Sequence, residues 1–587
     1  MPVFPKQIVQ KLSPYKGPSA GRLDYIRLDF GENTCGFPET YPHGLEPQKV
    51  SAYPEYEELL ASLAALYGVE SGNILLTNGS DEAISLVANT FIEPGRDKAV
   101  VSKPCFQMVP HALLLAGAEL VEVPVLADLS FDLAGIEKAL SMKPKLAMFA
   151  TPENPTGATI GSEVILEWCR RFPDTLFAVD EAYVEFSRVE PAAQPHALLK
   201  ATTLDQYSNL LVMRTFSKAW AMAGLRLGFI VSNPTNLEWL QRVRLPYSVN
   251  SAAVATALKL VGESSKVLAG ADSSVERKER LESELVARGY KLVRGQSNSF
   301  LLSLGINAQS VTDFLKERGL LVRNRSASVA PPGGIEKDQP TQADPLWGMV
   351  RVSTGSEDEN QRLLELLDEF NSGYALLFDL DGTLVDTSTS FDATVDELVF
   401  RYSGGRLAPD ELNCLRAEGG FNDDWVAAQE LLRRRGIEVD FGKLRDEAFE
   451  LYLSMAAANE TAFFDEGLLQ KAALKHPLFI VTGRTRREYE PVWASRLDAS
   501  FKRVYCLDDL PDARPKPAPD FLLRARSDYR IRDGIYVGNS VDDMQAARQA
   551  GFYAIGVCTN LSAATLRESG ADITVQNVNE IIEVLSL

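Results

Sequence analysis

Two separate groups of residues in this sequence have the types and spacing that catalysis requires. The first surrounds Lys218 in the string TFSKAWAMAGLRLGF, where a primary amine could condense with an aldehyde. The second is the string LLFDLDGTLVD, in which Asp379 and Asp381 follow an apolar run. Two such carboxylates can divide nucleophilic attack and proton transfer between them. Neither reaction needs the other, so the sequence predicts two catalytic sites on one chain.

The residues that precede Lys218 match the needs of a pyridoxal cofactor. That cofactor requires an amine for its aldehyde, a carboxylate for its ring nitrogen, a flat stacking face and donors for its phosphate. Asp180 in FAVDEAY would pair with the ring nitrogen, and Phe106 in KPCFQM would stack on the ring. Asn154 of PENPTG and Tyr183 would hydrogen-bond the phenolic oxygen.

The phosphate of such a cofactor would lie at the start of a helix. The turn NGSDE contains Gly79 and precedes a predicted helix, so the backbone amides of Ser80 and Asp81 can bind an anion there. Ser217 and Arg226 would complete this phosphate site. Each residue alone has an ordinary structural explanation, such as a surface position or a helix cap. Their joint occurrence in this order favours the cofactor hypothesis.

The second group suits the hydrolysis of a phosphate ester. That reaction requires an in-line nucleophile, an acid for the departing alkoxide and positive charge around the phosphoryl oxygens. Asp379 would attack the phosphorus, and Asp381 would protonate the leaving group and then activate water. Thr482, after PLFIV, would hydrogen-bond the phosphoryl group. Lys516 in RPKPAPDF would neutralise its charge.

Composition narrows the range of partners. The chain has 587 residues, of which 45% are hydrophobic, so it can form two or three cores. A net charge of −20 repels nucleic acid and anionic lipid, and we expect neither as a partner. No signal-peptide pattern or long apolar stretch occurs, the six cysteines form no C-x-x-C pair, and the four histidines form no cluster. We therefore expect reduced thiols, no zinc site and a cytoplasmic location.

The candidate residues follow predicted strands. Strand-like runs alternate with helical stretches in the first half, which predicts a parallel sheet covered by helices with functional groups at the strands' carboxyl ends. These runs are NILLT, KAVVS, KLAMFA, LFAVDEAY, LLVMRTFS and LGFIVS. The second half repeats the α/β pattern in YALLFD, PLFIVTG, GIYVGN and AIGVC. A charged, largely helical insertion at about 388–464 is interpreted as a cap.

These elements predict two units. Residues 1–372 would form a large α/β domain at about 45–273 and a small α+β domain from the N-terminal segment and about 274–372. Residues 373–587 would form a Rossmann-like domain that carries the helical cap. The joint Asn371–Gly373 is short, so we expect the two units to pack together.

The first unit resembles the fold-type I aminotransferases, specifically the histidinol-phosphate aminotransferase family, over residues 20–368. The strings TNGSDE, PENPTG, VDEAY, TFSKAWAMAG and GLRLGF carry this resemblance. It implies pyridoxal 5'-phosphate and a twofold dimer in which Tyr53 of SAYPEY reaches the neighbouring subunit's cofactor phosphate. It also implies that Arg323 in VRNRS and Arg351 in MVRVSTG hold the anionic end of each substrate. The alternative for Arg323 is a solvated turn residue.

Three departures from that family's pattern bear on the substrate. The N-terminal string N-E-N-P-x-G of the family is GENTCG here, from Gly31 to Gly36. The insert SVAPPGGIEKDQPTQADP, at 328–345, replaces a tighter turn between the two arginines. Phe106 stands where tyrosine is common, which removes only a hydroxyl group. The first two departures could change specificity.

The second unit resembles the haloacid dehalogenase superfamily with a helical cap, over residues 374–587. FDLDGT, VTGR, KPAPD and GNSVDDM carry the resemblance, and retention of Asp381 favours a phosphatase over a dehalogenase. It implies that Mg²⁺ is held by Asp379, the backbone carbonyl of Asp381 and Asp543. Asn539 occupies the position of a frequent aspartate ligand. It would offer an amide oxygen to the metal but removes a negative charge.

One molecule could visit both sites. The leading hypothesis is a bifunctional enzyme that transaminates imidazole-acetol phosphate with glutamate to give histidinol phosphate and 2-oxoglutarate. The second site would then hydrolyse histidinol phosphate to histidinol. One alternative keeps both chemistries for another phosphorylated amino compound, or replaces transamination with decarboxylation. Another makes the second unit weakly active or non-catalytic.

Overall fold

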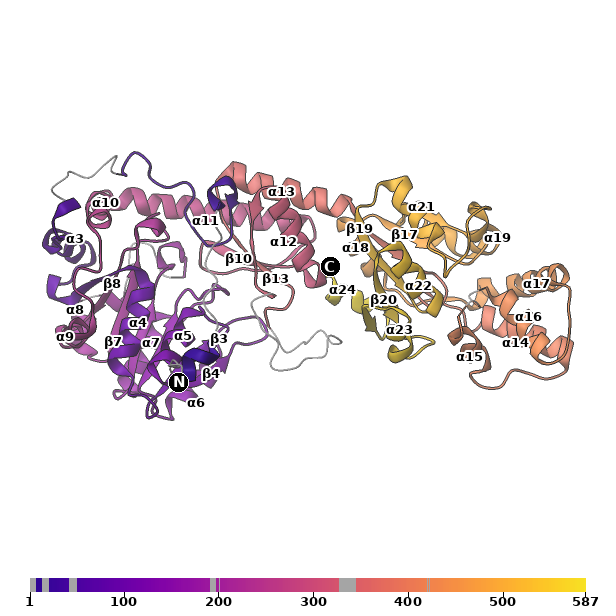
Figure 1. The fold of residues 1–587 in the computed structure, drawn as a ribbon, viewed down its shortest axis with the longest axis horizontal. Helices are drawn as coiled ribbons and strands as arrows, with labels where there is room; N and C mark the ends of the chain where they lie inside the picture. The colour runs from indigo at the N-terminus through magenta and orange to yellow at the C-terminus, as the bar shows by residue number, and fades with distance from the viewer. Residues whose placement is uncertain are drawn as a thin grey trace, which may run out of the picture.

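Four structural units follow one another along an elongated molecule in the computed structural model (Figure 1). A large α/β domain lies at one end, and a small α+β domain, a second α/β core and a helical cap follow it. The structure describes residues 7–12, 21–41, 50–189, 197–199, 201–326, 345–419, 421 and 423–586. The insert at 328–345 therefore lies outside the described residues, apart from Pro345.

The large domain is built on a seven-stranded sheet in the order β2-β8-β7-β6-β5-β3-β4. Strand β8 runs antiparallel to both of its neighbours, and the other pairings are parallel. The predicted parallel sheet is therefore present but is interrupted at β8, because an apolar run specifies burial and not strand direction. The strands are β2 Ile74–Thr77, β3 Lys98–Lys103, β4 Glu119–Pro124, β5 Leu146–Ala150, β6 Leu176–Asp180, β7 Leu210–Thr215 and β8 Gly228–Ser232.

Helices cover both faces of this sheet, so its central strands are buried on both sides. In β6, Phe177 and Val179 join one apolar cluster, and Leu176 and Ala178 join the other. Alternating residues of one strand thus serve two cores, and Asp180 ends the strand at the rim. The helices are α3 Glu57–Tyr67, α4 Gly79–Phe91, α5 Met108–Ala116, α6 Leu133–Leu140, α7 Ser162–Arg171, α8 Ala201–Gln206, α9 Pro234–Val243 and α10 Ser251–Gly262.

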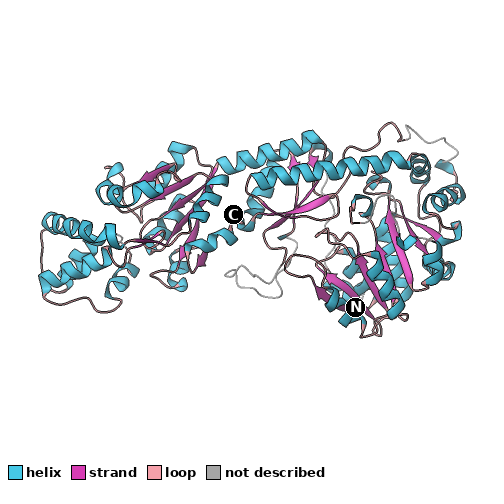
Figure 2. Cartoon of the chain, turned by 180° about the vertical axis from the view of Figure 1, so that it is seen from behind, coloured by secondary structure: helices cyan, strands magenta, loops and turns pink. Residues whose placement is uncertain are grey.

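The small domain is an antiparallel sheet, β12-β13-β10-β9, beneath two long helices that are visible from behind in Figure 2. The helix α11, Ser264–Ala287, is continuous through residue 274, where the boundary between the domains was expected. Strand β1, Ile26–Arg27, pairs with β11, so the N-terminal segment lies against this domain. The remaining elements are β9 Lys291–Val293, β10 Ser299–Ser303, α12 Ala308–Glu317, β11 Leu320–Leu321, β12 Arg323–Asn324, β13 Met349–Ser353 and α13 Glu357–Ser372.

Helix α13 leads directly into the second core. Ser356 and Glu359 form a capping box at its start, and β14, Tyr374–Phe378, begins two residues after its end. The second core is a six-stranded parallel sheet in the order β18-β17-β14-β19-β20-β21. Its other elements are β17 Leu478–Val481, β18 Arg503–Tyr505, β19 Asp533–Gly538, β20 Tyr553–Val557, β21 Ile573–Val575, α18 Glu466–Lys475, α21 Asp520–Tyr529, α22 Val541–Ala550, α23 Ala563–Ser569 and α24 Ile581–Val584.

The cap is a cluster of four helices inserted after β14. Its two connections to the core pair as a short antiparallel ribbon, β15 Val385–Asp386 with β16 Thr461–Ala462. The cap has its own apolar core, which includes Phe391, Trp425 and Tyr452. Its helices are α14 Phe391–Ser403, α15 Glu411–Ala417, α16 Asp424–Arg434 and α17 Phe441–Asn459.

The small domain and the second core share one apolar cluster. Leu304 and Phe314 contribute from the small domain, and Leu376 and Leu585 contribute from the second core. Within this cluster the Tyr374 ring stacks on Phe370 with ring centroids 5.1 Å apart, and its hydroxyl donates to Asn307 Oδ1 at 2.9 Å. The two units are therefore packed against each other, as the short joint predicted.

A buried lysine completes this interface. Lys475 Nζ donates to the carbonyl oxygen of Ser586 at 2.7 Å and lies 4.6 Å from the centroid of the Tyr290 ring. Burial, with a smaller contribution from Lys291, lowers the pKa of Lys475 to about 7. Burial at this interface therefore favours the neutral form of the Lys475 amine more than water does.

The lowered pKa of Lys475 predicts a pH-dependent stability. The unfolded chain keeps the ordinary lysine pKa of about 10.4, so between pH 7 and pH 10 it binds a proton that the folded chain does not. Lys475 therefore destabilises the fold fully below pH 7, and this cost decreases as the pH rises. We expect Lys475→Met to raise the melting temperature most at pH 7, with an advantage that shrinks towards pH 10. Lys471→Met, at an exposed position of the same helix, should show no such trend. Parallel pH profiles for wild type and Lys475→Met would contradict this account.

Candidate active sites

The expected cofactor residues converge on one cavity of about 430 Å³ between the large and small domains. Its lining also includes residues that the sequence argument did not identify, such as Phe30, Gln107 and Arg325. The predicted residues in the lining are Ser80, Asp81, Phe106, Asn154, Asp180, Tyr183, Ser217, Lys218, Arg226, Arg323 and Arg351. The cavity therefore brings together an amine, a carboxylate, an aromatic ring and phosphate donors.

Lys218 faces the N-terminal segment across this cavity. Its Nζ donates to the carbonyl oxygen of Phe30 at 2.7 Å and lies 5.3 Å from the centroid of the Tyr183 ring. Gly31 has φ 65°, and a Cβ atom at that position would lie 3.6 Å from the lysine nitrogen. A side chain there would be strained and would crowd the amine. The altered N-terminal string thus lies against the reactive group.

The predicted phosphate donors meet at the N-terminus of α4. Arg226 forms an ion pair with Asp81 at 2.8 Å, and its guanidinium donates to Ser217 Oγ at 3.4 Å. Gly79 has φ 75°, and a Cβ atom there would lie 2.6 Å from the Arg226 guanidinium. Only glycine keeps this loop close to the arginine. The free amides at the helix start and the guanidinium form a cradle for an anion.

One buried carboxylate lines the cofactor cavity, and a second is bonded to the residues of its wall. Burial, reinforced by Asp81 and Glu181, raises the pKa of Asp180 to about 7. A cationic ring nitrogen would supply the missing counter-charge. Glu153, which the sequence argument missed although it lies within PENPTG, is buried and accepts from Ser102 Oγ at 3.0 Å and from the backbone amides of Phe106 and Asn154 at 3.3 and 2.9 Å. It therefore fixes two predicted cofactor contacts.

Three arginines approach the cavity from the small domain. Arg323 in β12 lies directly opposite Arg351 in β13. Arg325 also lines the cavity, and it lies two positions after Arg323. The guanidinium of Arg323 lies 5.2 Å from the centroid of the Phe30 ring, and Arg351 donates to the carbonyl oxygen of Asp29 at 2.6 Å. Like charges on opposite positions destabilise a sheet, so this arrangement favours an anion between them. The spacing R-x-R, which begins in β12 and ends just after it, was a signal for Arg325 that could have been read.

Tyr53 is the one predicted cofactor contact that lies away from this cavity. Its side chain is 77% exposed, and its ring stacks on Tyr247 with centroids 4.5 Å apart. Leu245, two positions before Tyr247 in the sequence, is 72% exposed. The single chain therefore leaves an apolar surface around Tyr53.

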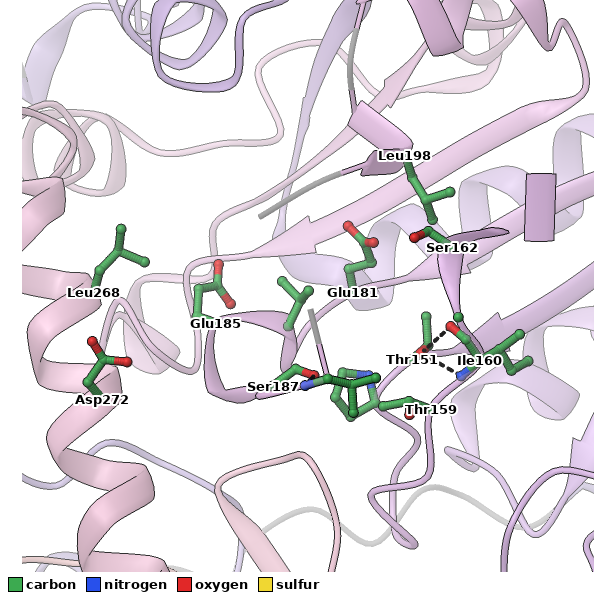
Figure 3. A pocket seen from close by; sticks show the side chains of 14 residues that line it. Thr151, Thr159, Ile160, Ser162, Glu181, Glu185, Ser187, Leu198, Leu268 and Asp272 are labelled. Atoms are coloured by element: carbon green, nitrogen blue, oxygen red, sulfur yellow. Dashed lines mark hydrogen bonds between the residues drawn. The ribbon is translucent and has the colours of Figure 1, made fainter. Parts of the chain in front are cut away.

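A second cavity in the large domain does not fit the cofactor (Figure 3). Its volume is about 60 Å³, and apolar side chains such as Leu198 and Leu268 line part of it. The carboxylates of Glu181 and Glu185 pair with the buried guanidinium of Arg214 at 2.7 and 3.5 Å. It offers room for about two water molecules and no reactive amine.

The predicted phosphohydrolase residues meet at the carboxyl end of β14. Lys516 Nζ contacts Asp379 Oδ1 at 2.6 Å, Asp543 Oδ1 at 2.7 Å and the Tyr536 hydroxyl at 3.1 Å. Burial, with the Asp543 carboxylate nearby, raises the pKa of Asp379. Burial opposes the charge on Lys516, but the two carboxylates hold its pKa well above its ordinary value.

Asp381 is held by groups from the strand after the cap. Thr482 Oγ1 donates to Asp381 Oδ2 at 3.1 Å, so Thr482 contacts the predicted acid. Arg484 donates to Asp381 Oδ1 through two nitrogens at 2.8 and 2.6 Å. The sequence argument missed Arg484, although VTGR placed a cation just after a strand that ends at this site.

The predicted metal ligands are only partly available to a cation. Both oxygens of Asp543 are occupied by donors: Lys516 and the Tyr536 hydroxyl bind Oδ1, and the backbone amides of Asn539 and Ser540 bind Oδ2 together with the Ser540 hydroxyl. Among the described residues, no group of three or more His, Cys, Asp and Glu side chains is arranged to hold a metal.

Three oxygens of the predicted donor set are nevertheless of the kind that a hard cation takes. They are the second carboxylate oxygen of Asp379, the backbone oxygen of Asp381 and the amide oxygen of Asn539, which accepts a bond from Thr383 at 3.3 Å. Mg²⁺ commonly takes one or two carboxylates and completes its shell with water and substrate phosphate. This donor set meets that requirement with a single negative charge.

The cap and the second core enclose a cavity of about 340 Å³ over the two aspartates. Aromatic residues Phe391, Trp425 and Phe449 line it together with acidic groups. The indole nitrogen of Trp425 donates to Glu488 at 2.8 Å, and Glu488 also accepts from the Thr485 hydroxyl at 2.8 Å. The cap thus provides an aromatic wall for a leaving group, and both acidic residues and arginines line the rest of the cavity.

The fold and the two sites define a pyridoxal-dependent aminotransferase joined to a hydrolase. The family model for aminotransferase class I and II matches residues 29–367, and that for haloacid dehalogenase-like hydrolase matches residues 376–557. The chain therefore belongs to the class I and II aminotransferases and carries a haloacid dehalogenase-like domain.

The aminotransferase part is similar to the histidinol-phosphate aminotransferases. It is 31% identical over 377 residues to histidinol-phosphate aminotransferase 2 of Haemophilus influenzae strain 86-028NP, which covers 62% of this chain and 96% of that protein. It is 32% identical over 375 residues to histidinol-phosphate aminotransferase 1 of Mannheimia succiniciproducens, over 61% and 95% of the two chains.

Solved structures show the same fold. The Sinorhizobium meliloti histidinol-phosphate aminotransferase, solved with pyridoxal 5'-phosphate, has a TM-score of 0.51 at 21% identity and covers 61% of this chain and 95% of its own. The Clostridium acetobutylicum enzyme has a TM-score of 0.50 at 20% identity, over 58% and 98%. Separately, no helix in the described part of the chain has the length and apolar character needed to cross a membrane.

The contacts of Glu153 give a test of the cofactor site. Glu153→Ala removes the acceptor from the Ser102 hydroxyl and from the amides of Phe106 and Asn154. An unsatisfied buried donor costs about 1–3 kcal/mol, so we expect the affinity for pyridoxal phosphate to fall by about five- to 150-fold. Glu153→Gln keeps an acceptor and should stay within about threefold of wild type. Absorbance titration of the apoenzyme measures both, and equal affinities for the two variants would exclude this positioning role.

Proposed function

We propose that the chain is a bifunctional enzyme that acts on histidinol phosphate at both sites. The first site would transfer an amino group from glutamate to imidazole-acetol phosphate, and the second would hydrolyse the resulting histidinol phosphate to histidinol. The observation that carries the proposal is the arginine pair Arg323 and Arg351 facing the cavity of Lys218. A transaminase binds its two substrates in turn, and guanidinium groups suit both a carboxylate and a phosphate.

At the first site, the cofactor would supply an electron sink for the bond at the substrate's α-carbon. The residues Ser80, Asp81, Ser217 and Arg226 would hold its phosphate, and Asp180 would hold its ring nitrogen. Asn154 and Tyr183 would orient the phenolic oxygen, and Phe106 would cover one face of the ring. The amine of Lys218 would move the proton at the substrate carbon.

At the second site, Asp379 would attack the phosphorus and the bond to the leaving oxygen would break. Asp381 would give that oxygen its proton and later take a proton from the water that releases phosphate. Lys516 and Thr482 would lie beside the charged oxygens. Mg²⁺ would supply further charge stabilisation, held by Asp379, the backbone of Asp381 and Asn539. We assign Asp543 to the orientation of Lys516, because its oxygens are already bonded.

The proposal includes a homodimer and a cytoplasmic location. The exposed pair of Tyr53 and Tyr247 would be covered by a second subunit, and Tyr53 would reach that subunit's cofactor phosphate. All six cysteines lie in described residues and are free thiols, which suits a reducing compartment. The proposed units are residues 1–372 and 373–587, with the cap at about 388–464.

Phosphorus NMR of purified protein tests the two reactions together. With histidinol phosphate, 2-oxoglutarate, pyridoxal phosphate and Mg²⁺, we expect a new phosphate ester and inorganic phosphate. Without Mg²⁺ only the ester should form, and without the oxo acid only inorganic phosphate. Lys218→Ala should abolish the ester signal alone. Asp379→Asn should lower phosphate release by at least about 10³-fold and leave transamination unchanged.

Each failure in this experiment has a distinct meaning. Asn539 donates to Thr559 Oγ1 at 3.3 Å and accepts from Thr383. These bonds favour a structural role for Asn539, so a non-catalytic second domain is the second candidate function. Phosphate release that is absent in wild type, or unchanged in Asp379→Asn, would support a non-catalytic second domain. Turnover of another phosphorylated amine, with histidinol phosphate inert, would change the substrate and retain the two chemistries.

A further inference from the structure

A buried arginine joins the predicted acid of the second site to the cap. Arg484 is 2% exposed and follows β17. Besides its two bonds to Asp381 Oδ1, its guanidinium donates to both carboxylate oxygens of Glu460 at 3.1 Å. It also donates to the Tyr452 hydroxyl at 2.7 Å. One fully desolvated cation thus has two carboxylate partners, and only Asp381 faces the cavity.

The geometry of this contact distinguishes the two oxygens of Asp381. Both Arg484 donors bind Oδ1, at 2.8 and 2.6 Å, whereas Oδ2 receives only the Thr482 hydroxyl at 3.1 Å. A proton on Oδ1 would face two N–H donors and would lose their bonds. The transferable proton is therefore confined to Oδ2. A guanidinium can impose this because its donors have a fixed planar arrangement, which an ammonium group lacks.

The same arginine contacts both chain segments that enter the cap. Glu460 follows α17, the last helix of the cap. Its side chain also accepts a hydrogen bond at 2.6 Å from Oγ of Ser390, the residue just before α14. The ring of Phe391, at the start of α14, lies 4.7 Å from the Arg484 guanidinium carbon. The indole nitrogen of Trp493 donates to Glu460 as well. The position of the cap and the orientation of Asp381 therefore depend on the same side chain.

We propose that Arg484 is a positioning residue that fixes the proton-donating oxygen of Asp381 and links it to the position of the cap. The inference rests on the proposed phosphatase function, in which Asp381 protonates the leaving oxygen. It follows that loss of the guanidinium fork should slow the hydrolysis of esters whose leaving group needs a proton. Esters whose leaving group departs as a stable anion should be much less affected.

The test compares two aromatic esters of similar size on the pyridoxal-loaded, Mg²⁺-supplied full chain. The leaving group of benzyl phosphate is an alkoxide, which needs a proton from the acid. The leaving group of p-nitrophenyl phosphate is a stabilised phenolate, which does not. We expect Arg484→Lys to lower kcat/KM by about 100-fold for benzyl phosphate and by less than about fivefold for p-nitrophenyl phosphate. Asp381→Asn should show the same selective loss. Arg503→Lys, at a side chain that is 49% exposed in the same domain, should change neither rate by more than about twofold.

Folding is checked on the same chain through transamination, which Arg484→Lys should leave unchanged. If the variant is poorly folded, Glu460→Gln provides a second test, because it keeps the arginine but removes its anchor to the cap. It should show a selective loss of about tenfold on benzyl phosphate. Equal losses on both esters, or no loss on either, would overturn the positioning role and leave the proposed function intact. A wild-type chain that hydrolyses neither ester would overturn the phosphatase proposal and this inference with it.

Discussion

The apolar contact between helix α13 and strand β14 constrains the rest of the molecule. Only Gly373 separates the last residue of the helix from the first of the strand, so the small domain and the second core cannot be arranged independently. Tyr374 and Phe370 lie in one buried cluster that contains residues of both. Because such a core is close-packed, motion of the small domain carries the second core with it. In Figure 1 the large domain lies beyond the small domain, and the cap lies at the opposite end, beyond the second core. The cofactor cavity is lined by residues of the large and small domains.

Each candidate site relies on buried charges that compensate one another at the ends of strands. Arg214 neutralises Glu181 behind the cofactor cavity, Lys516 bridges Asp379 and Asp543, and Arg484 bridges Asp381 and Glu460. Removing one member of such a set leaves an uncompensated charge, which costs about 3–5 kcal/mol. These groups therefore hold their neighbours in fixed orientations. Buried charge pairs of this kind also shift the pKa values of the groups at a strand end, as catalysis requires.

Local strings in the sequence were sufficient to place most of the cofactor site. Asp180, Asn154 and Lys218 each follow a strongly apolar strand, and the shared edge of the sheet brings them to one cavity. The reversed direction of β8 could not be read, because antiparallel and parallel buried strands have similar composition. Strand β4 was missed for a related reason, since two glutamates interrupt the apolar residues of ELVEVP and the strand is half exposed.

Contacts between distant segments account for what the sequence did not predict. Arg484 meets Asp381 across 103 positions, and no local pattern specifies that pairing. Asp543, a predicted metal ligand, also accepts bonds from Tyr536 and Ser540, which the sequence did not predict. The roles of individual residues and the domain boundaries remain predictions. The family assignment of both halves and their fold agree with the comparisons.

The shared core also affects how such a protein can change over generations. Side chains from both halves fill the space around Tyr374, and Ser303 and Ser586 hydrogen-bond across the contact at 2.8 Å. A hydrolase domain from another protein could not replace this one unless its docking face reproduced those shapes. Substitutions on one side are therefore tolerated only with matching changes on the other. The docking faces of the two domains are therefore expected to change together, by matched substitutions.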